Sequence, residues 1–348
     1  MPARGMEVKT PMESPQFVIF TTMKNEGPFM LEWVAHNLSL GFDGIVIYTN
    51  DCVDGTDLMA RRLEELGLAS HVSNPVKVRG NPQHQALRRA RNHPMVMNAT
   101  WLMCLDADEF INISVGERTI QALIEQTGPA DAISMAWRLF GCGGVEAYRD
   151  RPITEQFTLA DHPTDYASGR AYGLKTLFRN NGSFGRFGPH RPKDTPDDRL
   201  ADLKWSDGGG RLFPADKVGW RAWPGFDHSF GRIHHYSVRS VESFMVKRDR
   251  GRTNHIDVDQ AETYWRDMNI NRVEDKSILP LAERARPMLS QLLDDPVLKT
   301  LHAEACEWHR AKIAELQARE DWEPFRKWLY ENKLSVTSAD AKQAGNEQ

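Results

Sequence analysis

The sequence of 348 residues lacks the features that would place it outside the ordinary globular class. Its four cysteines, Cys52, Cys104, Cys142 and Cys306, form no Cys-x-x-Cys pair, so neither a zinc motif nor a disulfide framework is predicted. No apolar run reaches the ~18 residues of a membrane-spanning helix, and the first residues lack the apolar centre of a signal peptide. With 44 basic against 48 acidic residues, a polybasic nucleic-acid-binding protein is excluded. We therefore expect a cytoplasmic α/β protein with no nucleic-acid partner.

Strand-like and helix-like segments alternate over the first 110 residues. Short apolar runs predict strands at 17–22, 45–48 and 101–105. Segments with helical spacing predict helices at 28–40, 56–66 and 82–93. This alternation predicts βαβ units and a mostly parallel sheet. Because ligands bind beyond the carboxyl ends of such strands, we expect a site at the polar turns 23–26, 49–55 and 106–109.

The rest of the chain is organised differently. Residues 180–210 are rich in glycine, proline and aspartate and show little helical periodicity, which is typical of a functional loop. Helical spacing returns later and predicts helices at 242–250, 296–316 and 322–330.

The strongest single motif is Asp106-Ala107-Asp108-Glu109, which follows the apolar run 101–105. On an extended backbone, two carboxylates separated by one residue point to the same side. Mn²⁺ and Mg²⁺ prefer carboxylate oxygens and can bridge them to a diphosphate. An ordinary solvated turn at the end of a strand is the alternative interpretation.

Basic residues gather on either side of this motif. The stretch from Lys77 to His93 carries five lysines and arginines and no acid, and a second cluster spans 247–252. Both could neutralise a nucleotide diphosphate, although solvated helix faces give the same pattern. His234 and His235 are adjacent, so on a strand only one of them would face a given site.

Several motifs, taken in their order along the chain, resemble bacterial family-2-like glycosyltransferases of the GT-A fold. The turns 23–28 and 50–56 are similar to the opening and to the nucleotide-binding turn of that group, although Thr49 and Asn50 stand where that turn has two acids. Ala90-Arg91-Asn92 followed by Asp106-Ala107-Asp108 is similar to its metal motif and the triplet before it. Further motifs between 137 and 244 resemble a subfamily related to the family-92 and DUF23 transferases.

The resemblance implies an α/β fold with a GT-A-like mixed, mostly parallel sheet flanked by helices. The implied transferase domain covers 15–280, divided into a nucleotide-sugar half at 15–130 and an acceptor half at 131–280, followed by a helical extension at 281–336 and a disordered tail at 337–348. It also implies Mn²⁺ or Mg²⁺ held by Asp106, Asp108 and His235. We expect a nucleotide-sugar donor, UDP-sugar by preference, in contact with Lys24, Asn25, Glu26, Asn50, Asp54, Arg91, Asp106, Lys175 and His190.

Transfer with inversion also needs a base beside the acceptor hydroxyl. Asp207 is the predicted base, because the glycines that follow it would let an acceptor approach the backbone closely. Asp194 and Glu109 are the alternatives, and an ordinary turn aspartate is an equally good interpretation of Asp207.

The predicted partners are a nucleotide-sugar donor and a saccharide, polysaccharide or glycolipid acceptor. The basic cluster 247–252 adds the expectation of peripheral contact with the inner face of a membrane. A nucleotidyl or phosphoryl transferase on the same sheet is the second hypothesis, although the sequence contains no GxxxxGK[ST] loop. The third is a sugar-nucleotide-binding protein without catalytic activity.

Overall fold

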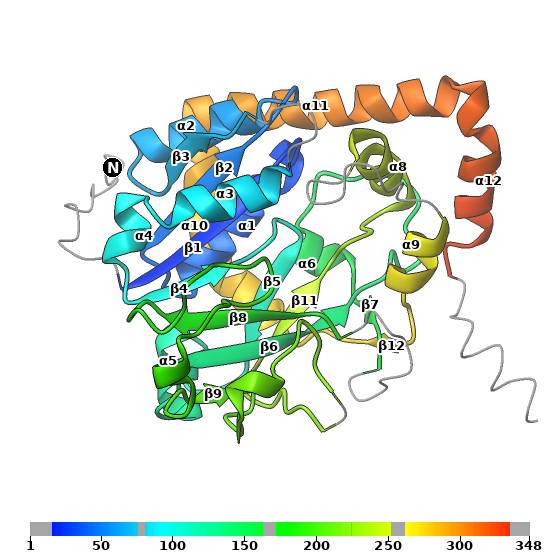
Figure 1. The fold of residues 1–348 in the computed structure, drawn as a ribbon. Coiled ribbons are helices and arrows are strands. Elements are labelled where there is room, and N and C mark those ends of the chain that lie inside the picture. The colour runs from blue at the N-terminus through cyan, green and yellow to red at the C-terminus, as the bar shows by residue number, and fades with distance from the viewer. Residues whose placement is uncertain (1–15, 76–80, 163–171, 224, 252–261, 335–348) are drawn as a thin grey trace, which may run out of the picture.

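The computed structural model describes residues 16–75, 81–162, 172–223, 225–251 and 262–334 of the chain (Figure 1). Its strands are β1 (Phe17–Met23), β2 (Gly44–Thr49), β3 (Ser70–Ser73), β4 (Trp101–Cys104), β5 (Glu109–Ile113), β6 (Ala132–Leu139), β7 (Leu159–Ala160), β8 (Leu174–Arg179), β9 (Trp205–Ser206), β10 (Leu212–Phe213), β11 (Gly231–His235) and β12 (Val273–Glu274). The α-helices are α1 (Gly27–Ser39), α2 (Thr56–Glu65), α3 (Pro82–Ala90), α4 (Pro94–Asn98), α5 (Ile120–Thr127), α6 (Ile153–Gln156), α7 (Asp197–Leu200), α8 (Val241–Arg250), α9 (Glu262–Met268), α10 (Leu279–Asp294), α11 (Pro296–Ala318) and α12 (Glu323–Glu331).

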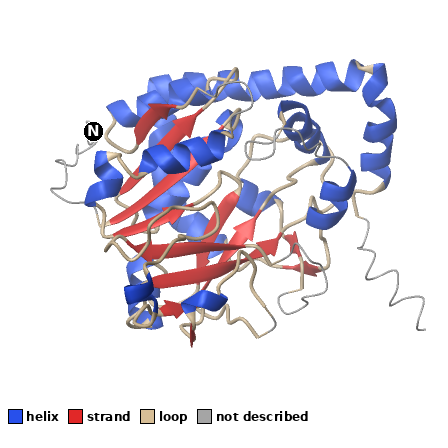
Figure 2. Cartoon of the chain, in the orientation of Figure 1, coloured by secondary structure: helices blue, strands red, loops and turns tan. Residues whose placement is uncertain are grey.

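A mixed, mostly parallel sheet forms the centre of the molecule, as the sequence predicted (Figure 2). Its strand order is β10-β9-β6-β8-β4-β1-β2-β3. Strands β3, β2, β1 and β4 run parallel, whereas β8 is antiparallel to both of its neighbours, β4 and β6. β11 pairs in parallel with β6 and antiparallel with β5, which brings the 231–235 segment next to the end of β4.

Different helices cover the two faces of the sheet. Side chains alternate along β1, so Ile19 packs in the hydrophobic cluster beneath α1 while Val18 and Phe20 pack in the cluster on the opposite face. Every residue of β2 is buried, as expected for a parallel strand covered on both faces. Helices α1, α2, α10 and α11 supply the first cluster, and α3 and α4 supply the second.

The C-terminal helices support the helix that reaches the site. Phe244 of α8 is buried in a cluster with Trp265 of α9, with Ile313 of α11 and with residues of α12. Ser243 of α8 also lies 3.1 Å from the Nε2 atom of His309 of α11. The long helix α11 crosses the top of the view in Figure 1, above α8, and packs against it. Within the described part of the chain, no helix combines the length and the hydropathy needed to cross a membrane.

The predicted strands at 17–22, 45–48 and 101–105 are confirmed, and so are the helices near 242–250, 296–316 and 322–330. Glu109 was expected in a turn, but it begins β5 and is fully buried. The helix expected at 82–93 is shorter than predicted: α3 ends at Ala90, and the separate helix α4 begins at Pro94.

The start of α2 lies at Thr56, where the sequence predicted it. Gly55 is the N-cap residue, with a φ of 85° that favours glycine, and the Asp54 carboxylate accepts from the N–H of Thr56. The expected tail at 337–348, Lys77 to Arg79 of the first basic stretch and Arg252 of the second lie outside the described residues.

Candidate functional site

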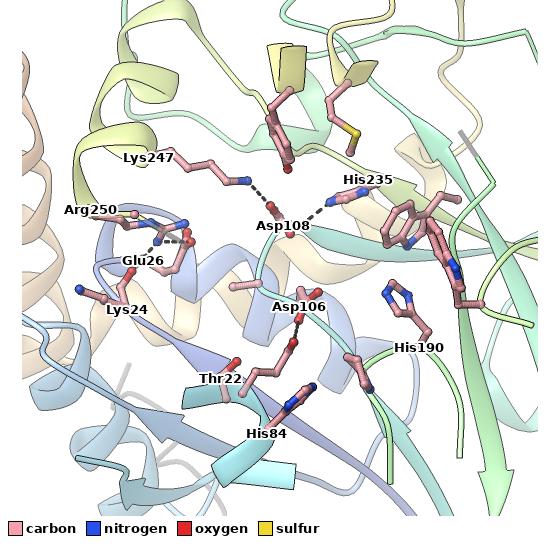
Figure 3. A pocket seen from close by; sticks show the side chains of 18 of the residues that line it. Thr22, Lys24, Glu26, His84, Asp106, Asp108, His190, His235, Lys247 and Arg250 are labelled. Atoms are coloured by element: carbon pink, nitrogen blue, oxygen red, sulfur yellow. Dashed lines mark hydrogen bonds and ion pairs between the residues drawn. The ribbon is translucent and has the colours of Figure 1, made fainter. Parts of the chain in front are cut away.

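A pocket of about 570 Å³ opens where the parallel strands β1 and β4 end. The residues that follow these strands, among them Lys24, Glu26, Asp106 and Asp108, line it together with residues of α3, α8 and β11 (Figure 3). Because the carboxyl ends of parallel strands meet at one edge of a sheet, the fold brings the predicted turns 23–26 and 106–109 to one place.

Asp106 is held by a fully buried lysine. The Lys175 ammonium, from β8, lies 2.9 Å from Asp106 Oδ2 and 3.0 Å from Glu109 Oε2. Gln83 of α3 donates to Asp106 Oδ1 at 2.9 Å, so both carboxylate oxygens have protein partners. Burial, opposed by Lys175 and assisted by Asp106, raises the pKa of Glu109 to about 7. Burial disfavours the charged amine, but Asp106 and Glu109 outweigh it and raise the pKa of Lys175.

Asp108 has different partners, which come from the far side of the pocket. Lys247 of α8 lies 2.7 Å from its Oδ2 atom, and the Nε2 atom of His235 lies 3.5 Å from its Oδ1 atom. Antiparallel pairing of β11 with β5 places His235 opposite Glu109 and therefore beside Asp108. Burial opposes ionisation, but Lys247 and His235 hold the pKa of Asp108 well below its usual range.

Two of the three predicted metal ligands are suited to a shared cation. Asp108 Oδ1 and His235 Nε2 are about as far apart as two ligands of one divalent ion, and a carboxylate with an imidazole suits Mn²⁺. Asp106 does not join them: among the described residues, the ligand atoms of Asp106, Asp108 and His235 do not all lie within 4.8 Å of one another. A cation here would therefore take Asp108 and His235 and complete its coordination with substrate or water oxygens.

Basic side chains line one wall of the pocket, which we call the basic wall: Lys24, Lys247 and Arg250 (Figure 3). Glu26 fixes its geometry, because its carboxylate forms ion pairs with Arg250 and, at 2.9 Å, with Arg239. Burial opposes ionisation of Glu26, but the two arginines lower its pKa. The carboxylate is thus neutralised, and the wall presents positive charge to the pocket.

His190 lies opposite the basic wall (Figure 3). Together with Trp137 and Trp220, which also line the pocket, it forms what we call the aromatic wall. The ring centroid of His190 lies 5.4 Å from that of Trp137 and 5.5 Å from that of Trp220. Its Nδ1 atom lies 3.1 Å from the carbonyl oxygen of Leu174, which can only accept, so Nδ1 carries the proton. Burial, reinforced by Lys175, lowers the pKa of His190 to about 4, so the ring is neutral near pH 7 with its lone pair on Nε2.

Four of the predicted donor contacts have structural partners instead of lining the pocket. Asn25 accepts a backbone hydrogen bond from the turn after β2, and Asp54 accepts one from Gly27 at 2.8 Å. Asn50 is 4% exposed and donates within its own turn, and Lys175 is buried beneath Asp106. These residues shape the turns that carry the site. The predicted residues that do line the pocket are Lys24, Glu26, Asp106, Asp108, His190 and His235.

Arg91 and the three candidate bases, Asp207, Asp194 and Glu109, lie outside the pocket lining. The Arg91 guanidinium is 6.0 Å from the centre of the Phe187 ring. Asp194 is exposed and forms an ion pair with Arg186 at 2.8 Å. Asp207 is fully buried, and its carboxylate accepts backbone hydrogen bonds from Gly209, Arg211 and Asp227. Because these bonds fix Asp207 inside its turn, we leave Asp207 and Asp194 out of the site.

Sequence reasoning missed part of the pocket. Lys247 and Arg250 were noted only as members of a basic cluster, yet their spacing of three residues places both on the face of α8 that meets the pocket. Gln83 lies within the basic stretch from Lys77 to His93, where only the charged residues gave a signal. Trp220 comes from an irregular loop, where no periodic signal could identify it.

Comparison with known proteins gives one sequence relative. No family model matches the chain. Over 162 residues, 45% of this chain, it is 24% identical to a glycosyltransferase family 92 protein of Ricinus communis. The chain is a distant relative of a family-92 glycosyltransferase. The match covers only 28% of the plant protein's length.

Solved structures add little to this relationship. TarS of S. aureus aligns over 38% of this chain and 23% of its own at 14% identity, with a TM-score of 0.27. A nucleoside-diphosphate-sugar pyrophosphorylase from Vibrio cholerae aligns over 47% of this chain and 74% of its own at 9% identity, with a TM-score of 0.25. Scores this low carry no argument about function, so the site must be interpreted from its own residues.

Proposed function

We propose that this chain is a metal-dependent glycosyltransferase that moves a sugar from a nucleotide-sugar donor to a hydroxyl acceptor, with inversion. The observation that carries the proposal is the Asp106-Ala107-Asp108 turn at the carboxyl end of β4, where it lines the pocket beside Lys247 and His235. The similarity to a family-92 glycosyltransferase supports the transferase class.

The basic wall suits the donor's diphosphate. When the anomeric bond breaks, charge develops on the diphosphate, and preorganised cations stabilise such charge by several kcal/mol, on the order of 10²–10³-fold per group. Lys24, Lys247 and Arg250 supply that charge from the protein. Mn²⁺ or Mg²⁺ held by Asp108 and His235 would add Lewis-acid neutralisation of the same group. Asp106, fixed by Lys175, offers its carboxylate to the ribose of the donor.

The aromatic wall suits the acceptor. Inversion requires the attacking hydroxyl to approach from the side opposite the leaving group, and the aromatic wall faces the basic wall across the pocket (Figure 3). Indole rings offer flat apolar surfaces for the carbon-bound face of a sugar ring. His190 replaces Asp207 and Asp194 as our candidate for the group that accepts the hydroxyl proton, because its Nε2 atom carries the lone pair.

We further propose a UDP-sugar as donor and a glycan, polysaccharide or glycolipid as acceptor. The volume of about 570 Å³ is within the usual range of about 300–1,000 Å³ for ligand pockets. A nucleotidyl transferase is the competing function, and it would prefer a nucleoside triphosphate to a nucleotide sugar.

Ligand-induced thermal stabilisation tests the donor assignment. A donor at about 100 times its Kd stabilises the folded state by about 2.7 kcal/mol, so a panel of nucleotide sugars with Mn²⁺ should raise the Tm of the wild-type chain by several degrees. Asp108→Asn should lose this donor-dependent rise. The matched control is Asp194→Asn, an exposed carboxylate outside the pocket lining, which should keep it.

Each variant is compared with its own ligand-free Tm, so an altered basal stability does not affect the result. The proposal fails if no nucleotide sugar stabilises the wild-type chain, or if Asp108→Asn responds as the wild type does. Stabilisation by nucleoside triphosphates alone would favour the nucleotidyl transferase.

A further inference from the structure

A second cluster of ligand-type side chains lies away from the pocket. His302 and Cys306 are four residues apart on α11 and therefore share one face of that helix. Asp150 reaches them from the loop between β6 and α6. One ligand atom from each of these three residues lies within 4.8 Å of the other two, which makes them a candidate metal-binding group within the described part of the chain.

The separations within the cluster match those of ligands that share one tetrahedral ion. His302 Nε2 lies 3.1 Å from Asp150 Oδ1 and 3.6 Å from Cys306 Sγ. Zinc bonds of about 2.0–2.1 Å to nitrogen or oxygen and about 2.3 Å to sulfur, at a tetrahedral angle, place N and O about 3.3 Å apart and N and S about 3.6 Å apart.

The same geometry argues against a nucleophilic Cys-His-Asp triad. In such a triad one ring nitrogen faces the nucleophile and the other faces the carboxylate. Here Asp150 and Cys306 both face Nε2, whereas Nδ1 of His302 is buried without a hydrogen-bond partner. Cys306 is also only 1% exposed, and the hydroxyl of Tyr148 donates to its sulfur at 3.1 Å. A buried thiol in these surroundings is unsuited to attack a substrate, but it can ligate a metal.

We propose that Asp150, His302 and Cys306 form a structural Zn²⁺ site that joins α11 to the loop before α6. A carboxylate, an imidazole and a thiolate are all zinc ligands, and a water molecule on the exposed side of Asp150 completes the coordination. Binding releases the protons of the thiol and of any protonated imidazole to solvent. Because α11 packs against α8, the ion would also stiffen the support of Lys247.

Cobalt substitution of the full-length chain tests this site independently of transferase activity. Co²⁺ bound to a thiolate gives a ligand-to-metal charge-transfer absorption, which the carboxylates of the pocket cannot produce. We expect this band to saturate at one equivalent per chain, to be displaced by Zn²⁺ and to disappear in Cys306→Ser. Cys52→Ser, a control at a cysteine that is not a member of the cluster, and Asp108→Asn should both keep the band.

A second readout covers the case in which Cys306→Ser folds poorly. Zn²⁺ should raise the Tm of the wild-type chain, and His302→Gln should weaken zinc binding by at least about 10–100-fold. A wild-type chain that gives no thiolate band overturns the site. So does a band that survives in Cys306→Ser, because the thiolate would then come from another cysteine. Unchanged zinc affinity in His302→Gln would leave a simple histidine–aspartate ion pair in its place.

Discussion

Asp106 and Asp108 are separated by one residue, yet their carboxylates have different partners. The carboxylate of Asp106 contacts Lys175 of β8 and Gln83 of α3. Asp108 belongs to the opposite side of the pocket, where Lys247 of α8 and His235 of β11 meet it. The ammonium partner is fully buried in the first case and 12% exposed in the second.

This difference indicates that the ion pair of Asp106 is fixed, whereas the ion pair of Asp108 can be exchanged. Moving Lys175 would leave two acids, Asp106 and Glu109, without their buried cation. Lys247 reaches its partner from the pocket wall, so an incoming diphosphate or cation could take over either member of that pair. We therefore expect Asp106 to keep its partners when a ligand binds and Asp108 to exchange its partner.

Removing the buried cation is the strongest test of this comparison. Breaking a buried ion pair by deleting one partner costs about 3–5 kcal/mol, so Lys175→Met should lower the free energy of unfolding by about that amount. Lys247→Met, the matched change at the other carboxylate, should cost less stability and instead reduce donor affinity. Urea denaturation of both variants measures the difference, and equal losses would refute the distinction.

The pH dependence of stability should next distinguish Glu109, the second acid beside Lys175, from Asp108. Burial, opposed by Lys175, raises the pKa of Glu109 from 4.5 to about 7, so its stabilising contribution is complete below pH 4.5 and is lost as pH rises through about 7. The loss approaches about 3 kcal/mol at 1.36 kcal/mol per pKa unit. Glu109→Gln cannot ionise, so relative to wild type it should gain stability between pH 4.5 and 7.

Asp108 provides the contrast with the opposite sign. Burial opposes its ionisation, but Lys247 and His235 lower its pKa, so its contribution is present above pH 3.8 and is lost as pH falls. Urea titrations at several pH values, with a chelator present, measure both effects. Parallel pH profiles of the free energy of unfolding for Glu109→Gln and wild type would show that burial does not raise the pKa of Glu109.

The sequence predicted the carboxyl-end location of the site because strand periodicity and turn composition are local signals. The apolar runs of β1, β2 and β4 and the polar turns after β1 and β4 follow from neighbouring residues alone. The partners of Asp106 could not be predicted in the same way. Lys175 lies 69 residues away and reaches Asp106 only because β8 pairs antiparallel with β4.

Long-range contacts also explain why the sequence could not show the surroundings of Asp207 or the second cluster of ligand-type side chains. Asp207 looked available beside its glycines, but the chain folds back so that Asp227 donates to it. Asp150 and His302 are 152 residues apart, so four scattered cysteines gave no sign of a ligand set. In each case the decisive contact depends on tertiary packing, which composition and spacing do not encode.

If Asp108 lies on the leaving-group side of the pocket, the group that accepts the hydroxyl proton must lie on the opposite side. A variant of His190 tests this expectation. General-base catalysis is worth at least about 10²-fold, so His190→Gln should lower kcat by about that factor, while donor affinity, governed by the basic wall, should stay unchanged. Trp220→Leu is the matched control: it alters the same wall without removing a proton acceptor, so it should raise the acceptor KM and leave kcat nearly intact. Steady-state kinetics with the donor identified by thermal stabilisation separates these outcomes. A His190→Gln variant that retains wild-type kcat would show that the aromatic wall binds the acceptor without accepting its proton.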